Sequence, residues 1–185
     1  MEIQNCISKL ILFLIILSSC SSSNKQIEDK FRECKKNFPN VDYIIIVNFS
    51  IPSGKNRFFL YDNNGKLLLE TLCEHGNGKG STKQIPKFSN QIESHCSSLG
   101  YYAVENYNIM SKTKLPSFIL NGVSSTNNNC KKRQILIHPY YDVPPFEIYP
   151  FYLNMSYGCF VINSIKFKKL SNIIINKKVI LYSYK

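Results

Sequence analysis

A cysteine and a histidine are the two residues of this sequence that together could do covalent chemistry. Cys159 lies in the run SYGCF, and His138 ends the apolar run ILIH, 21 residues earlier. A thiol becomes a nucleophile when a neighbouring imidazole accepts its proton. A strand that ends at His138 would deliver the imidazole to the edge of a sheet, where it can face a cleft. The pair therefore predicts a cysteine nucleophile, Cys159, with His138 as its base.

The residues before Cys159 could complete such a site. Gly158 has no Cβ, so the backbone there can approach a substrate carbonyl closely. The backbone N–H groups of Tyr157, Gly158 and Cys159 could then hold an oxyanion. On spacing alone an alternative stays open, because a cysteine in a strand is more often a small buried core residue and a histidine at a strand end is often structural.

Two short stretches upstream are candidates for binding substrate. His75 and Gly76 begin the run HGNGKG at the end of a predicted strand. His75 could orient His138, bind a substrate carboxylate, or only stabilise its loop by hydrogen bonds. Ser89 and Asn90 follow in the same loop, and they could bind substrate or only stabilise a turn.

A mainly β fold with a few short helices must position these residues. Tyr and Phe number 12 each, and β-branched and aromatic residues dominate the apolar set, which favours strands. Short helices are expected over residues 25–38 and 164–175. Pro, Gly and Asn-rich turns join the first three strands into an antiparallel meander. Strands are predicted over residues 42–51, 57–62, 66–76, 97–107, 116–123, 134–142, 156–162 and 177–185.

The first 40 residues have the pattern of an export and anchoring segment. The apolar run LILFLIIL, residues 10–17, is too short to cross a bilayer and suits the core of a signal peptide. Small residues and Cys20 follow directly, as in a bacterial lipobox, which predicts lipidation of Cys20. We expect a lipoprotein signal peptide at 1–19, a lipidated tether at 20–40 and a catalytic domain at 41–185. The alternative is an ordinary cleaved signal with an incidental cysteine.

Charge and cysteine content limit the partners. The net charge of +11 is spread along the chain rather than gathered in one stripe, and export argues against nucleic acid as a partner. No grouping of Cys and His resembles a metal site, so no metal is expected. Five cysteines remain after Cys6 and Cys20, and an odd number leaves at least one unpaired thiol. The sequence leaves open whether Cys34, Cys73, Cys96 and Cys130 pair.

Seven runs along the chain resemble, in order, the murein L,D-transpeptidase catalytic domain family, in the branch with HGxG and SSLG elements. The resemblance covers most of the chain, from Asp42 to Tyr184, and several short motifs in the right order are more specific than any one of them. The runs are DYIIIVNFSIPSGKNRFFLYD, HGNGKG, FSN, SSLG, QILIH, SYGCFVI and KKVILYSY.

This resemblance implies an L,D-transpeptidase-like β-sandwich or barrel without a cofactor. Ser156, Gly158 and Cys159 match the family's S-x-G-C motif, and Ser156 is a further candidate for substrate binding. Cys159 would attack the amide carbonyl of the diamino acid at position three of a murein stem peptide and form a thioester. An amine of a neighbouring stem would resolve the thioester into a 3-3 cross-link. His138 matches the family histidine, which acts first as base and then as acid.

Three other outcomes remain at this point. Water as the acceptor would give an L,D-carboxypeptidase, and an inert thiol would give a non-catalytic wall-binding lipoprotein. A papain-like peptidase is disfavoured because its cysteine precedes its histidine.

The sequence departs from the family pattern at two positions. Val161 stands where the better-known branch has Arg or Asn, and Pro139 where Gly is common, which affects substrate positioning. The expected protein is a monomer that binds peptidoglycan stem peptides, held at a membrane by its lipid and facing the periplasm or cell wall.

Overall fold

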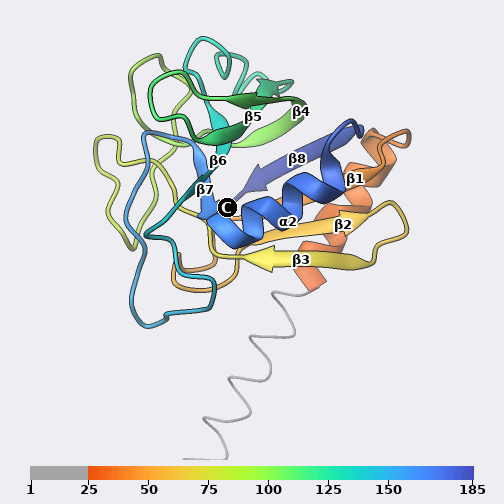
Figure 1. Cartoon of the computed structure of the whole chain (residues 1–185), viewed down its shortest axis with the longest axis horizontal. Helices are drawn as coiled ribbons and strands as arrows, with labels where there is room; N and C mark the ends of the chain where they lie inside the picture. Colours follow the sequence, from red (N-terminus) through yellow and green to blue (C-terminus); the bar gives the residue numbers. More distant parts are fainter. Residues whose placement is uncertain (1–24) are drawn as a thin grey trace, which may run out of the picture.

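The computed structural model of the protein describes residues 25–185 (Figure 1). The predicted signal peptide and the predicted lipidation site Cys20 lie outside the described residues. Residues 25–37 form a helix, close to the segment 25–38 expected from the sequence. No helix within residues 25–185 has the length and apolar character needed to cross a membrane.

Eight strands form one sheet in the order β3-β2-β1-β8-β4-β5-β6-β7, which confirms the mainly β prediction. Neighbouring strands are antiparallel except for β1 with β8 and β6 with β7, which run parallel. The strands are β1 (Tyr43–Asn48), β2 (Phe58–Asp62), β3 (Leu67–Thr71), β4 (Gly100–Ile109), β5 (Pro116–Gly122), β6 (Leu136–Tyr140), β7 (Phe160–Asn163) and β8 (Val179–Tyr184).

The chain that continues β3 brings the two edges of this sheet together. β3 ends at Thr71, and the extended residues 72–77 run beside the chain that leads into β7. The N–H of Glu74 donates to the carbonyl of Val161 over 2.9 Å, and the N–H of Ser156 donates to the carbonyl of His75 over 2.9 Å. The sheet is therefore nearly closed, and residues 72–77 lie next to the strand that follows Cys159.

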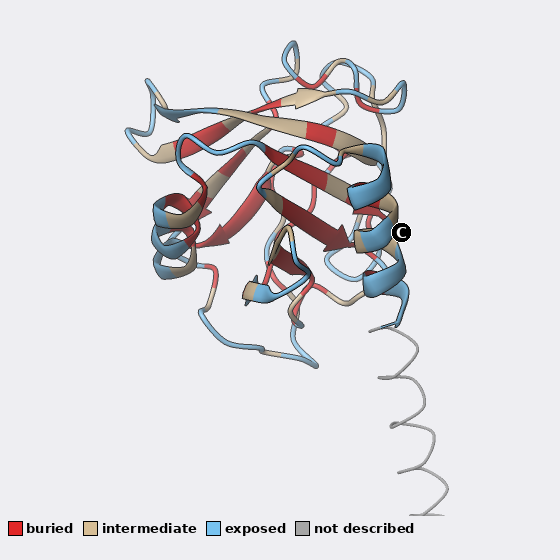
Figure 2. Cartoon of the chain, turned by 90° about the vertical axis from the view of Figure 1, so that its right-hand side faces the viewer, coloured by how far each residue is buried: buried red, intermediate tan, exposed pale blue. Residues whose placement is uncertain are grey.

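The sheet lies between two helices, as Figures 1 and 2 show from two directions. Helix α2 (Ser164–Ile174) buries Phe167 and Leu170 in the main core, together with alternate residues of the strands. Ile27 and Cys34 of the helix at 25–37 are buried against the opposite face of β1, β2 and β8. The folded part of the chain therefore includes residues 25–40, and the expected tether is not flexible over residues 25–37.

The connection between β7 and α2 is direct. Asn163 is the last residue of β7 and also the N-cap of α2, where its side-chain oxygen accepts from the N–H groups of Ile165 and Lys166. Its amide nitrogen donates to the carbonyl of Val143 over 2.6 Å. A cap of this type contributes about 1 kcal/mol to a helix. Asn163 thus fixes one end of the strand whose other end follows Cys159.

All five cysteines of the described chain are free thiols. Cys34, Cys73, Cys96 and Cys130 are buried, and Cys159 is the one with partial exposure. The four buried cysteines therefore pack as small apolar residues, and Cys159 is the thiol that a ligand can reach.

Candidate active site

The register between β6 and β7 determines which way His138 points. His138 pairs with Val161 and Ile137 pairs with Phe160 in this parallel pair of strands. Ile137 and Phe160 belong to the main core. Because side chains alternate along a strand, His138 and Val161 point to the other, outer face.

Cys159 lies on the same outer face. It packs with Val161 in a small group that we call the outer cluster, which consists of Leu72, Val143, Leu153 and Val161 with Ile148 and Cys159 at its edge. Two residues along one strand and one strand across correspond to roughly 8 Å between Cα atoms. The register therefore makes His138 and Cys159 diagonal neighbours on one face of the sheet.

The His138 ring is held in the form that can accept a proton. Its Nδ1–H donates to the carbonyl of Pro139 over 3.0 Å, which leaves Nε2 as the unprotonated nitrogen. Burial lowers the pKa of His138 below its ordinary value, against a smaller raising effect of that hydrogen bond. The imidazole is thus neutral at neutral pH, and Nε2 has no hydrogen-bond partner within the described chain.

The Cys159 thiol is protonated at rest. Protein atoms surround the sulfur although the residue is partly exposed, and this burial raises the pKa of Cys159 to about 11. The backbone N–H of Leu136 and the charge of Arg133 oppose this rise. Sγ lies 3.7 Å from the carbonyl oxygen of Gln134. A base must therefore remove the thiol proton during attack.

Arg133 is a member of the site that the sequence analysis did not find. Its guanidinium donates to the carbonyl of Ser89 over 2.8 Å, to the Ser98 hydroxyl over 3.2 Å and to the carbonyl of Cys96. In the sequence Arg133 is only the end of a KKR run, which reads as surface charge. Its partners lie 35 to 44 residues earlier in the chain, so only the fold reveals that this charge is fixed near Cys159.

Ser156 and Gly158 shape the turn that presents Cys159. The Ser156 hydroxyl donates to the carbonyl of Cys159 over 2.8 Å and accepts the N–H of Gly158 over 3.2 Å. Gly158 has φ +107°, and a Cβ on it would lie 2.8 Å from the carbonyl oxygen of Cys96. The motif therefore encodes a backbone conformation that only glycine adopts without strain.

This turn changes the expected set of oxyanion donors. The N–H of Gly158 is already donated to Ser156, so it is not free in the resting site. The N–H of Tyr157 has no acceptor within the described chain. The Tyr157 ring is exposed and lies edge-on to His95, with ring centroids 5.0 Å apart. Tyr157 is therefore a better candidate donor than Gly158.

His75 and Gly76 hold the loop and do not face the cavity. His75 is fully buried; its Nδ1 accepts from Arg57 over 2.9 Å and its Nε2–H donates to the carbonyl of Thr82 over 2.8 Å. Burial, with the nearby Arg57 charge, lowers the pKa of His75 to about 4. A Cβ at Gly76 would lie 2.2 Å from the carbonyl oxygen of His95. Of the three roles considered for His75, the geometry supports stabilisation of the loop.

Ser89 and Asn90 also bond within the protein. The Ser89 hydroxyl accepts the N–H of Gln91 over 3.1 Å. The Asn90 side chain donates to Asn128 over 2.7 Å and accepts the N–H of Asn129 over 3.2 Å. These contacts tie two loops together, which supports the turn alternative over substrate binding.

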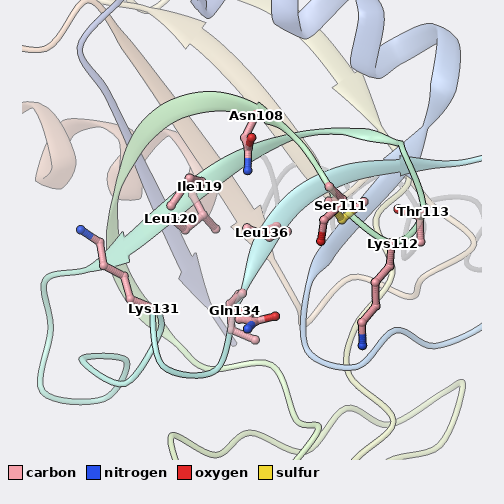
Figure 3. Close-up of a pocket in the computed structure, with 11 residues that line it drawn as sticks. Asn108, Ser111, Lys112, Thr113, Ile119, Leu120, Lys131, Gln134 and Leu136 are labelled. Carbon is pink, nitrogen blue, oxygen red and sulfur yellow. The ribbon is translucent and has the colours of Figure 1, made fainter.

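An open cavity of about 660 Å³ continues the face that carries His138 and Cys159 (Figure 3). It lies under the hairpin between β4 and β5, and the cross-strand pair Ile119 and Leu136 forms part of its lining. Leu136 precedes His138 by two residues, so both point to the same face. Lys112 and Lys131 also line the cavity, and Lys131 forms an ion pair of 2.8 Å with Glu105.

Fold and site together define a class: a mainly β protein with a thiol just before β7 and a neutral imidazole on the neighbouring β6. Neither side chain lines the open cavity, but Gln134, which lies against the sulfur, does. A family model described as the L,D-transpeptidase catalytic domain matches residues 19–184. This chain therefore belongs to the L,D-transpeptidase catalytic domain family, which confirms the resemblance at the level of the family; the branch stays a prediction.

Among solved structures, the chain is similar to the helical cell shape determining protein Pgp2 from Campylobacter jejuni, with 16% identity and a TM-score of 0.49. The match covers 77% of this chain and 47% of that protein. The carbamoyl enzyme formed by Ldtfm with avibactam matches with 16% identity and a TM-score of 0.46, over 78% of this chain and 49% of that protein. The chain thus spans about half the length of these proteins. A comparison with curated proteins gave no match.

Proposed function

We propose that this protein is a murein L,D-transpeptidase that forms a thioester on Cys159 and transfers the acyl group to an amine. One observation carries the proposal: the His138 ring is neutral, and its free Nε2 lies on the same face of the sheet as the Cys159 thiol. The family shares this class of reaction, and its acceptor is the part that has to be established for this chain.

In the first half-reaction, Sγ of Cys159 attacks the amide carbonyl carbon of the diamino acid at position three of the stem peptide. Nε2 of His138 takes the thiol proton as the S–C bond forms. The C–N bond then breaks, and the imidazolium returns the proton to the amine of the leaving D-amino acid. Arg133 favours the sulfur anion during this step, because its charge lowers the thiol pKa.

In the second half-reaction, the amine of a neighbouring stem attacks the thioester carbonyl. The C–S bond breaks, a new C–N bond forms, and His138 transfers the proton lost by the nitrogen back to the sulfur. The cavity beside Cys159 is large enough for part of a peptide. Lys112 and Lys131 line this cavity, and their positive charges favour binding of the stem-peptide carboxylates.

Hydrolysis of the same thioester is the second candidate outcome. Cys159 is partly exposed and the cavity beside it is open, so water can reach the thioester. An L,D-carboxypeptidase would result if no amine binds well enough to compete. A wall-binding protein without catalysis is disfavoured by the free thiol and the base-form histidine together. We also propose that a lipid on Cys20 holds the domain at a membrane, facing the periplasm or cell wall.

The test is mass spectrometry of products from a purified disaccharide-tetrapeptide. We expect cross-linked dimer from the wild-type protein and no acyl transfer from Cys159→Ala. His138→Ala should lower the rate about 10²- to 10⁴-fold, the usual contribution of a general base. Cys34→Ala, which removes a buried thiol on the opposite face, is the matched control and should retain activity.

The products separate the candidate functions. Tripeptide in place of dimer would identify the carboxypeptidase, and no product from a folded wild-type protein would support the binder. Normal turnover by Cys159→Ala would overturn the assignment of the nucleophile.

A further inference from the structure

Glu74 is a buried carboxylic acid on the same face as Cys159 and His138. Only 4% of the residue is exposed. Its N–H donates to the carbonyl of Val161, which places Glu74 beside β7 on the side away from β6. Leu72 belongs to the outer cluster and Cys73 to the main core, so the alternation of this extended segment directs Glu74 outward.

No hydrogen bond or ion pair reaches the Glu74 carboxylate from any residue between 25 and 185. The nearest cations are engaged elsewhere. Arg57 donates to the carbonyls of Cys73 and Ile51 and to His75. Burial, together with Asp142, raises the pKa of Glu74 to about 7. The Glu74 oxygens are not among the fully enclosed side-chain atoms that lack a partner within residues 25–185, so a ligand can reach this largely buried acid.

The rim above Glu74 contains a second carboxylate. Asp142 lies close enough to Glu74 to raise its pKa, and it accepts a hydrogen bond from Asn154 over 2.8 Å. Lys83 donates to the oxygen of Asn154 over 2.7 Å rather than to either acid. The two acids thus form a pair of negative groups in a chain whose net charge is +11, and Glu74 is the one whose charge acts on Cys159.

The charge of Glu74 works against the nucleophile. An anionic Glu74 raises the pKa of the Cys159 thiol. A cation bound at Glu74 would remove this effect and satisfy the buried carboxylate. The reaction proposed above uses such a cation, because a primary amine is an ammonium ion at neutral pH. A basic surface would otherwise repel it.

We propose that Glu74, with Asp142 at the rim, binds the ammonium group of the amine acceptor next to the thioester on Cys159. The inference rests on the proposed function and names the recognition site for its second substrate. The ligand class is a primary alkylamine, such as the side-chain amine of a diamino acid in a stem tripeptide. The bound ammonium passes one proton to the Glu74 carboxylate and attacks as the free amine, so Glu74 favours aminolysis of the thioester over hydrolysis.

Binding is measured first, without turnover. In a Cys159→Ala background, we expect a stem tripeptide with a free side-chain amine to bind at least tenfold more tightly than its N-acetylated form. Adding Glu74→Gln should remove this preference. Glu70→Gln, an exposed acid four residues earlier in the same segment of chain, is the matched control and should retain it. Equal preference with and without Glu74 would overturn the proposal.

Kinetics then separate this inference from the proposed function. Glu74→Gln should release the terminal D-amino acid at least as fast as the wild type, because the charge that raises the thiol pKa is removed. It should also raise the KM for the amine about tenfold and shift products from dimer to tripeptide. A merely structural role would lower both half-reactions and the melting temperature together. If the wild-type protein forms no thioester, the proposed function fails, and the binding measurement still decides the role of Glu74.

Discussion

At the scale of single residues, Arg133 controls how readily the Cys159 thiol loses its proton. Its charge lowers the pKa of Cys159, and three acceptors hold its guanidinium in place. We expect Arg133→Met to raise the thiol pKa, so that iodoacetamide labels Cys159 about tenfold more slowly for each unit of increase. Labelling rate against pH, followed by peptide mass spectrometry, measures this change.

Lys132→Met is the matched control, because Lys132 is the exposed neighbour of Arg133 and removes the same charge. It should leave the labelling profile unchanged. Arg133→Lys keeps the charge but loses the planar set of guanidinium donors. Its labelling rate should therefore lie between those of the wild type and Arg133→Met. An identical profile for Arg133→Met and the wild type would show that Arg133 does not act on the thiol.

The sequence alone was enough to select Cys159 and His138 as candidates, because a thiol and an imidazole can act as nucleophile and base. Cys159 and His138 stand in short motifs, and the order of those motifs located them. Arg133 and Glu74 were missed because nothing local distinguishes a buried acid or a fixed guanidinium from surface charge. His75 was weighed as a ligand-binding residue because its motif is conspicuous, whereas its burial depends on Arg57, 18 residues earlier.

At the scale of elements, the turn at residues 156–159 determines where the thiol points. Gly158 has φ +107°, and an added Cβ would meet the Cys96 carbonyl oxygen and the Ile135 side chain, each at 2.8 Å. Gly158→Ala should therefore destabilise the protein by about 1–3 kcal/mol and lower activity by displacing Cys159. Urea unfolding and product formation measure the two effects.

Gly80→Ala separates backbone strain from crowding. Gly80 has φ +83°, but a Cβ there would meet only the Lys87 side chain at 3.6 Å. Gly80→Ala should therefore lower the free energy of unfolding as Gly158→Ala does, but it should not lower product formation. Equal activity losses in the two variants would mean that crowding at Gly158 is not what positions Cys159.

The strands themselves were largely predictable, because runs of β-branched and aromatic residues lie between turn residues. The helix expected at 164–175 is present as α2, at Ser164–Ile174. The predicted strand at 66–76 stops at Thr71, since the following residues pair with the chain before β7 in an irregular way. Pairing between distant segments of the chain is what local patterns do not contain.

At the scale of the whole molecule, two buried groups make stability depend on pH in opposite directions. The pKa of Glu74 is raised from 4.5 to about 7, so the folded protein binds its proton more tightly and loses stability as pH rises from 4.5 to 7. The pKa of His75 is lowered from 6.5 to about 4, so stability is lost as pH falls from 6.5 to 4. The two slopes partly cancel between pH 4.5 and 6.5.

In Glu74→Gln, the pH dependence of folding stability that His75 causes should no longer be offset by Glu74. Relative to wild type, this variant should gain about 3 kcal/mol between pH 4.5 and pH 7, because it lacks the buried acid that must ionise. Urea unfolding of both proteins at half-unit pH steps measures the difference. A constant difference across this range would show that Glu74 does not titrate with a raised pKa.

The mainly β class followed from composition, but the strand order did not. Two parallel pairs, β1 with β8 and β6 with β7, join segments that are far apart in the chain or linked by long loops. The helix that packs on the sheet before residue 41 was also not apparent from its pattern as part of the fold. A polar helix at 25–37 reads as a linker until Ile27 and Cys34 are seen buried against the sheet.

The shortness of β7 has a mechanical consequence. Four residues, Phe160–Asn163, separate the bend that holds the sulfur from the first turn of α2, and two of them are anchored in the main core. A change in packing beneath α2 therefore also displaces Sγ of Cys159, because the short strand cannot absorb the movement. Interior mutations far from the substrate, at Phe167 or Leu170, can tune reactivity without touching the cavity at all.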